Sequence, residues 1–417
     1  MKQAENSSTG AKGALDGVRV LDLSRVLAGP LSAQVLADLG ADVIKVERPD
    51  SGDDSRQWAP PFVAGAPQTP LDESAYFWSC NRGKRSIGIN LATQSGRKLI
   101  ARLAAESDVL IENYKVGTLE RYGLGYAALS KINPKLIYCS ITGFGQTGPY
   151  SARPGYDTIV QAMGGLMSLT GNPDGTPGAG PRKAGVAVSD LMTALYSSVA
   201  ILAALNERHS SGLGQYIDMS LLDVQVSALS NLGMNYLATG DVPQRAGNRL
   251  ASVYPSDSFA CSDGDLMLIV GNDGQFRNFC KAMEMPGVAE DPRFCRNELR
   301  MRNANILSGL VSAAMAKRTM AECQALLDAA GVPASPINNL KQVFANPQVI
   351  AREMVRDLST TDGRQVRAIA SPIRMSRTPP TYRRDPPKLG EHNAEVLRDV
   401  LGLTEQECED LKLDGAI

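Results

Sequence analysis

A strand–helix–strand pattern near the N-terminus constrains the fold more than any other feature of the sequence. Val18–Leu23 and Asp42–Glu47 are short apolar runs typical of buried strands, and Pro30–Leu39 between them has helical spacing and ends at Gly40. This unit predicts two parallel strands joined by a right-handed crossover helix. Further strands are expected at residues 87–91, 109–113, 136–141 and 214–219. The pattern favours an α/β fold with a Rossmann-like parallel sheet.

Two glycine patterns bear on nucleotide binding, and neither supports a dinucleotide site. The first strand-to-helix turn, residues 24–30, contains only Gly29, whereas a dinucleotide fingerprint needs Gly-x-Gly-x-x-Gly there. Gly143–Gly148 matches that spacing, but Pro149 and polar residues follow where a helix should begin. We therefore expect a turn-rich loop at Gly143–Gly148 and no NAD. Because ligands collect at the carboxyl ends of parallel strands, Arg25, Arg48 and Asn113 are expected on the ligand side of the sheet.

A long apolar helix is expected at Leu191–Leu205, directly after Ser189 and Asp190. Its composition, with almost no charge, predicts a helix buried nearly all round. One interpretation of Ser189 and Asp190 is that their side chains cap the helix by accepting hydrogen bonds from its first N–H groups. The other is that Asp190, ionised at neutral pH and sited at the mouth of a buried helix, attacks an activated carbonyl. The residues alone leave both interpretations open.

Charge and residue counts narrow the classes of function. The formal net charge is −1 over 417 residues, which gives no general attraction to nucleic acid or anionic membranes. The seven cysteines form no CxxC pair, which favours reduced thiols, and the presence of only two histidines argues against a multi-histidine metal site. Residues 1–13 lack a signal-peptide core, and no apolar run is long enough to predict a membrane span. The expectations are a cytoplasmic protein with no metal, no nucleic-acid partner and no membrane partner.

The chain changes character twice after the central helix. A Gly- and Pro-containing stretch begins at residue 240, and a smaller α/β segment follows with its clearest strand at Leu266–Gly271. An exposed connector is expected at Gly331–Asn338. We therefore predict a large domain whose N-terminal part is 14–239, a small domain at 240–335, and a linker and C-terminal part at 336–417 that returns to the large domain.

Several motifs occur together in one order along the chain. They are Arg25-Val-Leu-Ala-Gly-Pro30, Leu39-Gly-Ala-Asp-Val-Ile-Lys-Val-Glu-Arg48-Pro, Gly52-Asp-Asp54, Asn81-Arg-Gly-Lys-Arg-Ser-Ile87, Glu112-Asn-Tyr114, Gly143-Phe-Gly-Gln-Thr-Gly-Pro149, Gly155-Tyr-Asp157 and Leu389-Gly-Glu-His392. With these motifs the sequence resembles the class III CoA-transferases, the formyl-CoA and carnitine CoA-transferase family, over nearly its whole length. Within that family it is most similar to the succinyl-CoA:glutarate subgroup, through Ile137-Tyr-Cys-Ser-Ile-Thr142, Pro336-Ile-Asn-Asn339 and Val343-Phe-Ala-Asn-Pro-Gln-Val349.

The resemblance implies a fold, a catalytic residue and a set of ligand contacts. It implies an interlocked homodimer of chains with a large Rossmann-like and a small α/β domain, and it places the catalytic aspartate at Asp190, which would carry CoA as a thioester. For the CoA thioester substrate, the family pattern falls on Leu27, Ala28, Arg48, Ile89, Ala92, Asn113, Tyr114, Lys115, Arg121, Tyr156 and Asp157. Neither ATP nor a metal is needed, because the energy of one thioester is conserved in the next.

Substrate choice is the part the resemblance determines least. A dicarboxylate keeps one free carboxylate as a thioester, so a cation should face it, with Arg25 the first candidate and Arg249 the second. Gly271 and Asn272, in a loop at a strand end, are candidates for a lid over the substrate. Leu27 replaces the glutamine of formyl-CoA transferase, and Tyr156 replaces the histidine of the 2-methylacyl-CoA racemases. The alternatives are a racemase on the same fold and a non-catalytic protein that binds CoA or a nucleotide.

Overall fold

The structure is a computed structural model that describes residues 12–63, 74–250, 252–360 and 363–417. The polar segment 1–11, on which part of the expectation of a cytoplasmic protein rests, lies outside the described residues. The chain forms two compact units. Unit 1 comprises residues up to Gly165, Ala184–Met234 and Ile350–Ile417, and unit 2 comprises Leu166–Lys183 and Asn235–Val349. The predicted division at 14–239, 240–335 and 336–417 stays a prediction.

Unit 1 contains a six-stranded sheet in the order β3-β2-β1-β4-β5-β6. Its strands are β1 (Arg19–Asp22), β2 (Asp42–Glu47), β3 (Lys84–Gly88), β4 (Val109–Glu112), β5 (Ile137–Thr142) and β6 (Tyr216–Ser220). All neighbouring pairs are parallel, so the predicted α/β sheet is confirmed. The order reverses between β1 and β4, the point at which open α/β sheets bind ligands beside the carboxyl ends of their strands.

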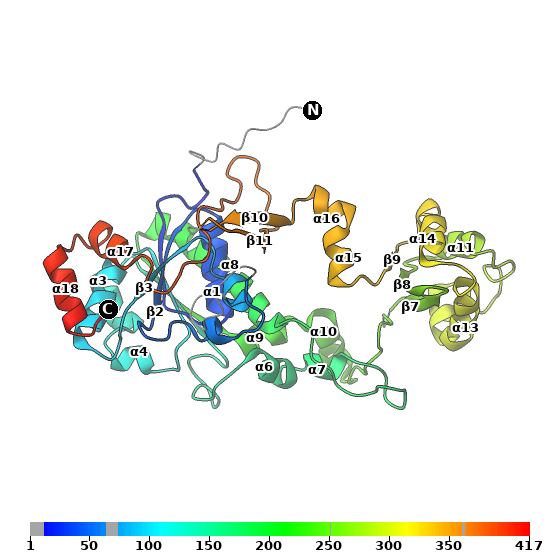
Figure 1. Cartoon of the computed structure of the whole chain (residues 1–417). Helices are drawn as coiled ribbons and strands as arrows, with labels where there is room; N and C mark the ends of the chain where they lie inside the picture. Colours follow the sequence, from blue (N-terminus) through cyan, green and yellow to red (C-terminus); the bar gives the residue numbers. More distant parts are fainter. Residues whose placement is uncertain (1–11, 64–73, 251, 361–362) are drawn as a thin grey trace. The chain divides into compact units, whose positions relative to one another are not determined.

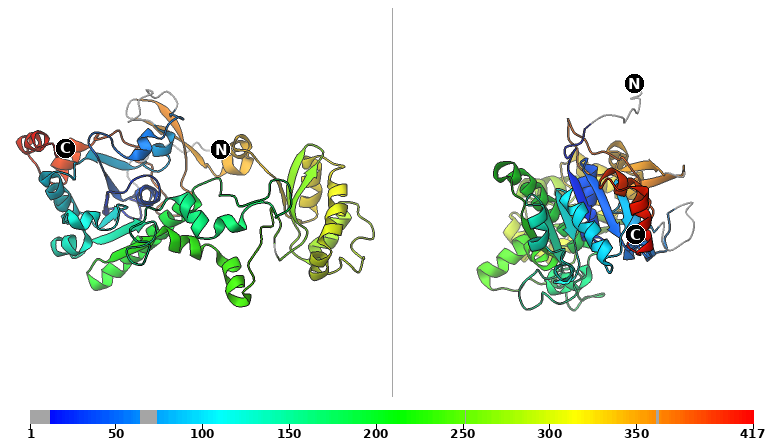
Figure 2. Two further views of the ribbon diagram at one scale, coloured as in Figure 1. Left: turned by 90° about the horizontal axis from the view of Figure 1, so that it is seen from below. Right: turned by 90° about the vertical axis from the view of Figure 1, so that its left-hand side faces the viewer.

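Helices cover both faces of this sheet (Figures 1 and 2). On one face, α1 (Ala28–Asp38) and α8 (Val188–Ser211) bury Leu36 and Ile201 against β1 and β5. On the other face, α3 (Gln94–Ala105) and α17 (Asn393–Asp399) bury Leu103 and Val396. The other elements of unit 1 are η1 (Asp54–Gln57), α2 (Ala75–Trp78), α4 (Thr118–Arg121), α5 (Tyr126–Ile132), α6 (Asp157–Met163), α9 (Leu221–Ser227), β10 (Val355–Ser359), β11 (Gln365–Ile369) and α18 (Glu405–Leu413).

Unit 2 is built on an antiparallel sheet of three strands, in the order β7-β8-β9. The predicted strand at 266–271 corresponds to β8, which begins and ends two residues earlier. Its buried core joins Leu266 and Leu268 of β8 to Phe279 and Leu307 of the helices. The elements of this part are α7 (Leu166–Leu169), α10 (Ser230–Thr239), β7 (Ser256–Cys261), β8 (Gly264–Ile269), α11 (Asp273–Ala282), α12 (Asn297–Arg302), α13 (Ala304–Met315), α14 (Met320–Ala329), β9 (Ala334–Pro336), α15 (Leu340–Ala345) and α16 (Pro347–Ala351), with α10 and α16 at its junctions with unit 1.

The central helix α8 is less buried than the sequence predicted. We expected it to be buried nearly all round, but Leu195, Tyr196 and Val199 are 54%, 45% and 63% exposed in the single chain. Its buried side carries mostly small or hydroxyl-bearing residues, among them Thr193 and Ser197. The prediction was wrong because an apolar composition does not tell an internal face from a face left open on one chain. By length and composition α8 is also the one described helix able to cross a membrane, a test that core helices of soluble proteins pass as well.

Candidate active site

A cavity of about 380 Å³ opens in unit 1 at the carboxyl ends of β1, β4 and β5, where the strand order reverses. Four cations and two acids contribute to its wall. The lining residues are Arg25, Val26, Leu27, Ala28, Asp54, Asn113, Tyr114, Lys115, Val116, Thr118, Arg121, Ile141, Thr142, Gly143, Ser151, Ala152, Arg153, Pro154, Gly155, Tyr156, Asp190 and Leu221. Nine of the residues predicted from the sequence meet here: Arg25, Leu27, Ala28, Asn113, Tyr114, Lys115, Arg121, Tyr156 and Asp190.

Asp190 lies in the first turn of α8, but it does not cap the helix. The N-cap residue of α8 is Ala187, and its side chain makes no hydrogen bond to the first turn. The oxygen that caps the helix comes instead from Asp157 of α6. Asp157 Oδ1 accepts hydrogen bonds from the backbone N–H groups of Ser189 and Asp190, at 2.9 and 3.4 Å. The interpretation of Asp190 as a helix cap was therefore wrong, and its carboxylate remains available to the cavity.

The surroundings of Asp190 raise its pKa. Burial opposes the charged form, and the carboxylate of Asp157 adds a like charge, so that the pKa of Asp190 rises to about 7. This corrects the expectation of a fully ionised side chain, since a group with that pKa is only about half ionised at pH 7. Burial, with a smaller contribution from the nearby charge of Asp190, raises the pKa of the Tyr76 phenol on α2. A carboxylate destabilised as an anion in this way is poised to lose its charge by acylation.

Asp157 is part of a buried polar network and does not line the cavity. Its Oδ2 accepts a hydrogen bond of 2.6 Å from Gln161 Nε2, and Gln161 Oε1 accepts one of 2.9 Å from the backbone N–H of Ala184. On the other side, Ser189 Oγ donates to Gln225 Oε1 of α9 at 2.7 Å. Three helices, α6, α8 and α9, are thus joined around the first turn of α8. The network fixes the backbone that carries Asp190.

Arg25 and Arg48 share one carboxylate. Arg25 Nη1 lies 2.9 Å from Asp54 Oδ2, and Arg48 Nη2 lies 2.7 Å from Asp54 Oδ1. The Arg25 guanidinium also lies 5.3 Å from the centre of the Tyr114 ring, and its buried Nε has no hydrogen-bond partner among the described residues. Two positive charges facing one negative charge leave a net positive charge at the cavity. Asp54 belonged to a motif quoted for the family resemblance, but its role as a shared counter-ion was not predicted.

The loop after β4 is fixed by the acid that precedes it. Asn113 clamps the backbone of Arg25, accepting its N–H at 2.9 Å and donating to its C=O at 2.8 Å. Glu112 accepts the N–H of Tyr114 at 2.8 Å and a short hydrogen bond from Ser140 Oγ. Burial raises the pKa of Glu112 to about 7. The raised pKa of this second carboxyl was not predicted, because its environment is formed by strands far apart in the chain.

Other predicted ligand residues lie away from the cavity lining. Ile89 is buried in the core beneath α3, and Ala92 is exposed in the loop before that helix, with its N–H bound to Asn90 Oδ1 at 3.0 Å. Arg48 is half-exposed and reaches the cavity only through Asp54. Their predicted roles in CoA binding are therefore carried by the family resemblance alone.

Arg249, Gly271 and Asn272 belong to unit 2 and have local partners there. Arg249 Nε lies 3.6 Å from Asp257 Oδ2. The backbone N–H of Gly271 donates to Gln275 Oε1 at 2.8 Å, and Asn272 Oδ1 caps α11 by accepting the N–H of Gln275 at 2.9 Å. The lid role of Gly271 and Asn272, and the substrate role of Arg249, stay predictions.

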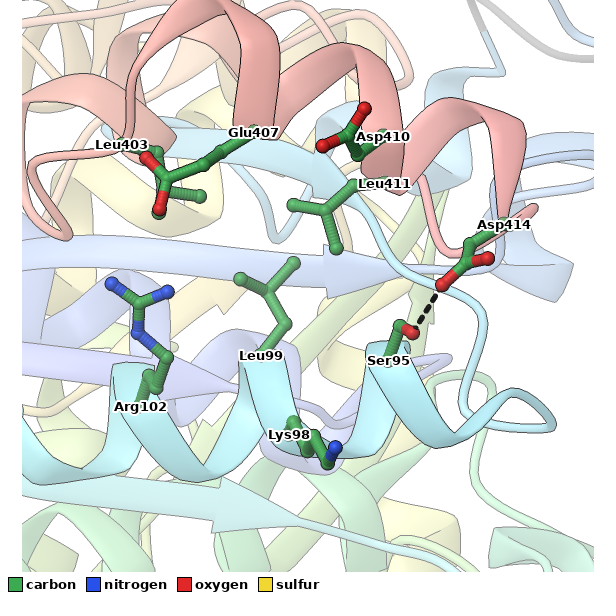
Figure 3. Close-up of a pocket in the computed structure, with 9 residues that line it drawn as sticks. All are labelled: Ser95, Lys98, Leu99, Arg102, Leu403, Glu407, Asp410, Leu411 and Asp414. Carbon is green, nitrogen blue, oxygen red and sulfur yellow. Dashed lines mark hydrogen bonds between the residues drawn. The ribbon is translucent and has the colours of Figure 1, made fainter.

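A second hollow, of about 290 Å³, lies between α3 and α18 (Figure 3). Lys98 and Arg102 on α3 and three acids of the C-terminal segment line it, and Ser95 Oγ donates to Asp414 Oδ2 at 2.6 Å. None of the residues predicted for ligand binding lies there. No group of three or more His, Cys, Asp or Glu side chains in the described residues has an arrangement able to hold a metal ion.

Residues 15–393 match the model of a protein family described as "CoA-transferase family III". The chain belongs to CoA-transferase family III. It is 49% identical over 386 residues to the succinate–glutarate CoA-transferase of Agrobacterium fabrum, covering 93% of this chain and 95% of the relative. It is 42% identical over 403 residues to the succinyl-CoA:glutarate CoA-transferase of Mus musculus, covering 97% and 90%. The crystal structure of a CAIB/BAIF family protein from Brucella suis superposes with a TM-score of 0.83 at 46% identity, covering 93% of this chain and all of that one. The family inferred from the motifs is therefore confirmed, and so is the α/β fold with a parallel sheet.

Proposed function

We propose that this family III protein transfers CoA from an acyl-CoA donor, succinyl-CoA, to a small dicarboxylic acid through a thioester on Asp190. The observation that carries the proposal is the position of Asp190. Its half-buried carboxylate lies at the start of α8, with the capping N–H groups taken by Asp157, in a cavity lined by four cations. The names of the two curated relatives support succinyl-CoA as donor and a dicarboxylate such as glutarate as acceptor.

The reaction proceeds by four acyl transfers in which atoms and charges balance. The Asp190 carboxylate attacks the thioester carbonyl and expels the CoA thiolate, which leaves a mixed anhydride on Asp190. The thiolate then attacks the aspartyl carbonyl carbon, releases succinate and forms the aspartyl-CoA thioester. The acceptor carboxylate displaces CoA thiolate from that thioester to give a second anhydride. Attack of the thiolate on the acceptor's acyl carbon yields the new acyl-CoA and restores the Asp190 carboxylate.

The raised pKa of Asp190 suits this chemistry in two respects. A carboxylate held as a destabilised anion is a better nucleophile than one tied to a cation, and its attack removes the charge that burial disfavours. Each tetrahedral intermediate needs N–H donors for its oxyanion. Gly143 and Gly155 line the cavity and pack so closely that a Cβ on Gly143 would stand 2.6 Å from the Gly155 Cα, which lets backbone approach the reacting atoms.

The cavity cations supply the charge that CoA needs. CoA carries a diphosphate and a 3′-phosphate, and charge-assisted hydrogen bonds from Arg or Lys are strong partners for such groups. Lys115, Arg121 and Arg153 line the cavity. We assign CoA binding to this wall together with Leu27, Ala28, Asn113, Tyr114 and Tyr156, with no NAD and no metal as cofactor.

The protein is further proposed to act as an interlocked homodimer in the cytoplasm, without nucleic-acid or membrane partners. The exposed apolar face of α8, with Leu195, Tyr196 and Val199, supports an additional protein surface that covers it. A lid from the loop at Gly271 and Asn272 is proposed to keep water from the anhydride, which would otherwise hydrolyse.

Trapping of the covalent intermediate tests the proposed function. After incubation with succinyl-CoA, borohydride reduction or hydroxylamine should modify the peptide that contains Asp190 and no other peptide, as read by mass spectrometry. Asp190→Asn should abolish transfer while the protein stays folded, because Asp157 and not Asp190 caps α8. A folded Asp190→Asn protein with about a tenth of normal activity or more would rule out the covalent mechanism, since loss of a nucleophile costs several orders of magnitude.

A further inference from the structure

The turn between β1 and α1 has a backbone conformation that its sequence does not favour. Val26 has φ +73°, a left-handed conformation that is a genuine outlier for a β-branched residue. Such strain persists only where surrounding contacts enforce it, and it is concentrated at functional sites. Val26, Leu27 and Ala28 line the same cavity as Asp190. The contacts that hold this turn are therefore of interest for ligand binding.

A completely buried ion pair, Lys45–Asp53, forms hydrogen bonds to the backbone of the turn between β1 and α1. Lys45 Nζ lies 2.8 Å from Asp53 Oδ2, and both side chains are 0% exposed. Asp53 accepts the N–H of Val26, with Oδ1 at 3.1 Å and Oδ2 at 3.3 Å. Lys45 Nζ also donates to the C=O of Ser24 at 3.0 Å. The pair thus binds the turn on both sides of Arg25.

Asp53 is itself rigidly held, so it can impose a conformation on Val26. Its Oδ1 accepts the N–H of Ser55 at 2.9 Å and the Ser55 hydroxyl at 2.8 Å. Its own N–H donates to Glu47 Oε2 at 2.9 Å, and Arg56 Nε lies 2.7 Å from the same oxygen. Both oxygens of the Asp53 carboxylate are thus used, and three of its contacts are made with the N–H of Val26 or with Lys45.

Stability alone does not account for such a pair. The cost of removing two charges from water is large, and apolar residues of similar volume often replace a buried ion pair without loss of stability. What apolar residues cannot do is accept the N–H of Val26 in its left-handed conformation. Leu27, the residue before α1, offers no side-chain cap, so the conformation of the turn also sets the direction of the free N–H groups at the start of α1.

We propose that Asp53 is a positioning residue for acyl-CoA: with its charge balanced by Lys45, its carboxylate oxygens hold the Ser24–Leu27 turn in its strained form so that Leu27 and Ala28 present their backbone to the ligand. This inference rests on the proposed function, because it takes the cavity to be the acyl-CoA site. It adds to the site one buried residue, Asp53, that does not line the cavity. The residue that transmits its effect is Val26.

The test compares two neutral replacements of the pair that differ in one acceptor oxygen. Lys45→Met/Asp53→Asn removes both charges but keeps an oxygen for the N–H of Val26, whereas Lys45→Met/Asp53→Leu removes that oxygen as well. CoA affinity is measured by calorimetry, KM for succinyl-CoA and kcat by steady-state assay, and protection of the 24–28 backbone by hydrogen exchange. The matched control is Arg82→Met/Asp38→Leu, which removes another buried pair, of 2.6 Å, whose residues do not line the cavity.

We expect the Asn variant to bind CoA within about threefold of the parent, since one hydrogen-bond acceptor is retained. The Leu variant should bind about tenfold or more weakly, with a raised KM, a smaller change in kcat and lost protection at 24–28, since a misplaced binding loop costs affinity. The control should lose thermal stability but keep its CoA affinity.

Equal CoA affinity in the Asn and Leu variants would overturn the inference, as would an equal loss in the control. If the Leu variant does not fold, Lys45→Met/Asp53→Ala gives the same comparison, and the same outcomes apply. Failure of the parent protein to bind CoA at all would instead overturn the proposed function, so the two failures are distinguishable.

Discussion

At the scale of the residue, the site depends on carboxylates whose neighbours set their charge. Asp53 is held as an anion by Lys45, which lowers its pKa against the opposing effect of burial. Among the residues that the structure describes, no cation is paired with Asp190, and burial together with Asp157 raises its pKa to about 7. The same residue type thus serves as a fixed structural anion in one place and as a reactive group in another. The difference comes from the tertiary environment, which the sequence does not state.

The raised pKa of Asp190 predicts that Asp190→Asn stabilises the protein at alkaline pH. Between the unfolded pKa of about 3.9 and the folded pKa of about 7, the folded state binds more protons, so stability falls as pH rises through this window. A three-unit shift corresponds to about 4 kcal/mol, which partial solvent exposure reduces to about 1–3 kcal/mol. Denaturant unfolding should show this gain for Asp190→Asn at pH 8 and little gain near pH 4. A constant difference at both pH values would show that the charge of Asp190 is not destabilising.

Arg25 is predicted to act on the free carboxylate of the dicarboxylate. Arg25→Ala should raise KM for glutarate by about tenfold, the effect expected for a charge-assisted hydrogen bond, and should change KM for a monocarboxylate of equal length much less. Arg48→Ala is the control, because Arg48 shares Asp54 with Arg25 but does not line the cavity. Equal losses for both acids in Arg25→Ala would assign Arg25 to CoA or to the structure.

At the scale of the element, periodicity predicted most of the sheet but missed where charge is buried. Four residues of the predicted first strand form β1, and the second strand coincides with β2. The third strand was predicted from Ile87, whereas β3 begins at Lys84, because Lys84 and Arg85 read as a polar segment. In the fold their charges meet Asp22 and Asp42, at 2.8 and 2.6 Å. Such pairing joins residues far apart in sequence, and a single-sequence pattern does not contain it.

Contacts between residues far apart in the chain also explain what was and was not predicted for α8 and for the candidate active site. The apolar run predicted that α8 exists, and the prediction correctly placed Asp190 in its first turn. The capping oxygen of Asp157 and the counter-ion Asp54 were not predicted, because a helix from another part of the chain supplies the first and a shared ion pair defines the second. Motif matching found the residues of the site, whereas their contacts required the fold.

The exposed face of α8 is predicted to be a dimer interface. Leu195→Glu/Val199→Glu should convert a dimer to monomers or unfolded protein, because two charges would be buried without partners. Sedimentation velocity measures the oligomeric state. The control is Leu413→Glu on α18, also an exposed leucine, which should remain dimeric. A stable dimer of the α8 variant would show that the interface lies elsewhere.

At the scale of the whole molecule, the net charge of the chain does not indicate the charge of its cavity. The chain has a formal net charge of −1, which excludes a global field, yet the cavity wall carries Arg25, Lys115, Arg121 and Arg153 against Asp54 and Asp190. The four cations against two acids give this cavity an excess of positive charge that the net charge of the chain does not indicate. Unit 1 and unit 2 also have separate hydrophobic cores, one on each face of the parallel sheet and one around β8.

Separate cores and a cavity formed by unit 1 predict that CoA stabilises the two units unequally. A ligand that binds only the folded state adds about 2.7 kcal/mol at a concentration of 100 times Kd, equivalent to a rise of about 4–5 °C in Tm for a unit of this size. Scanning calorimetry should therefore show the transition of unit 1 moving upward with CoA while that of unit 2 moves less, with hydrogen exchange assigning each transition to its unit. Asp190→Asn should keep this shift, because it preserves the cavity while removing the nucleophile. Equal movement of both transitions would mean that unit 2 contributes to CoA binding or that the units unfold together, and the assignment of CoA contacts to unit 1 alone would then be wrong.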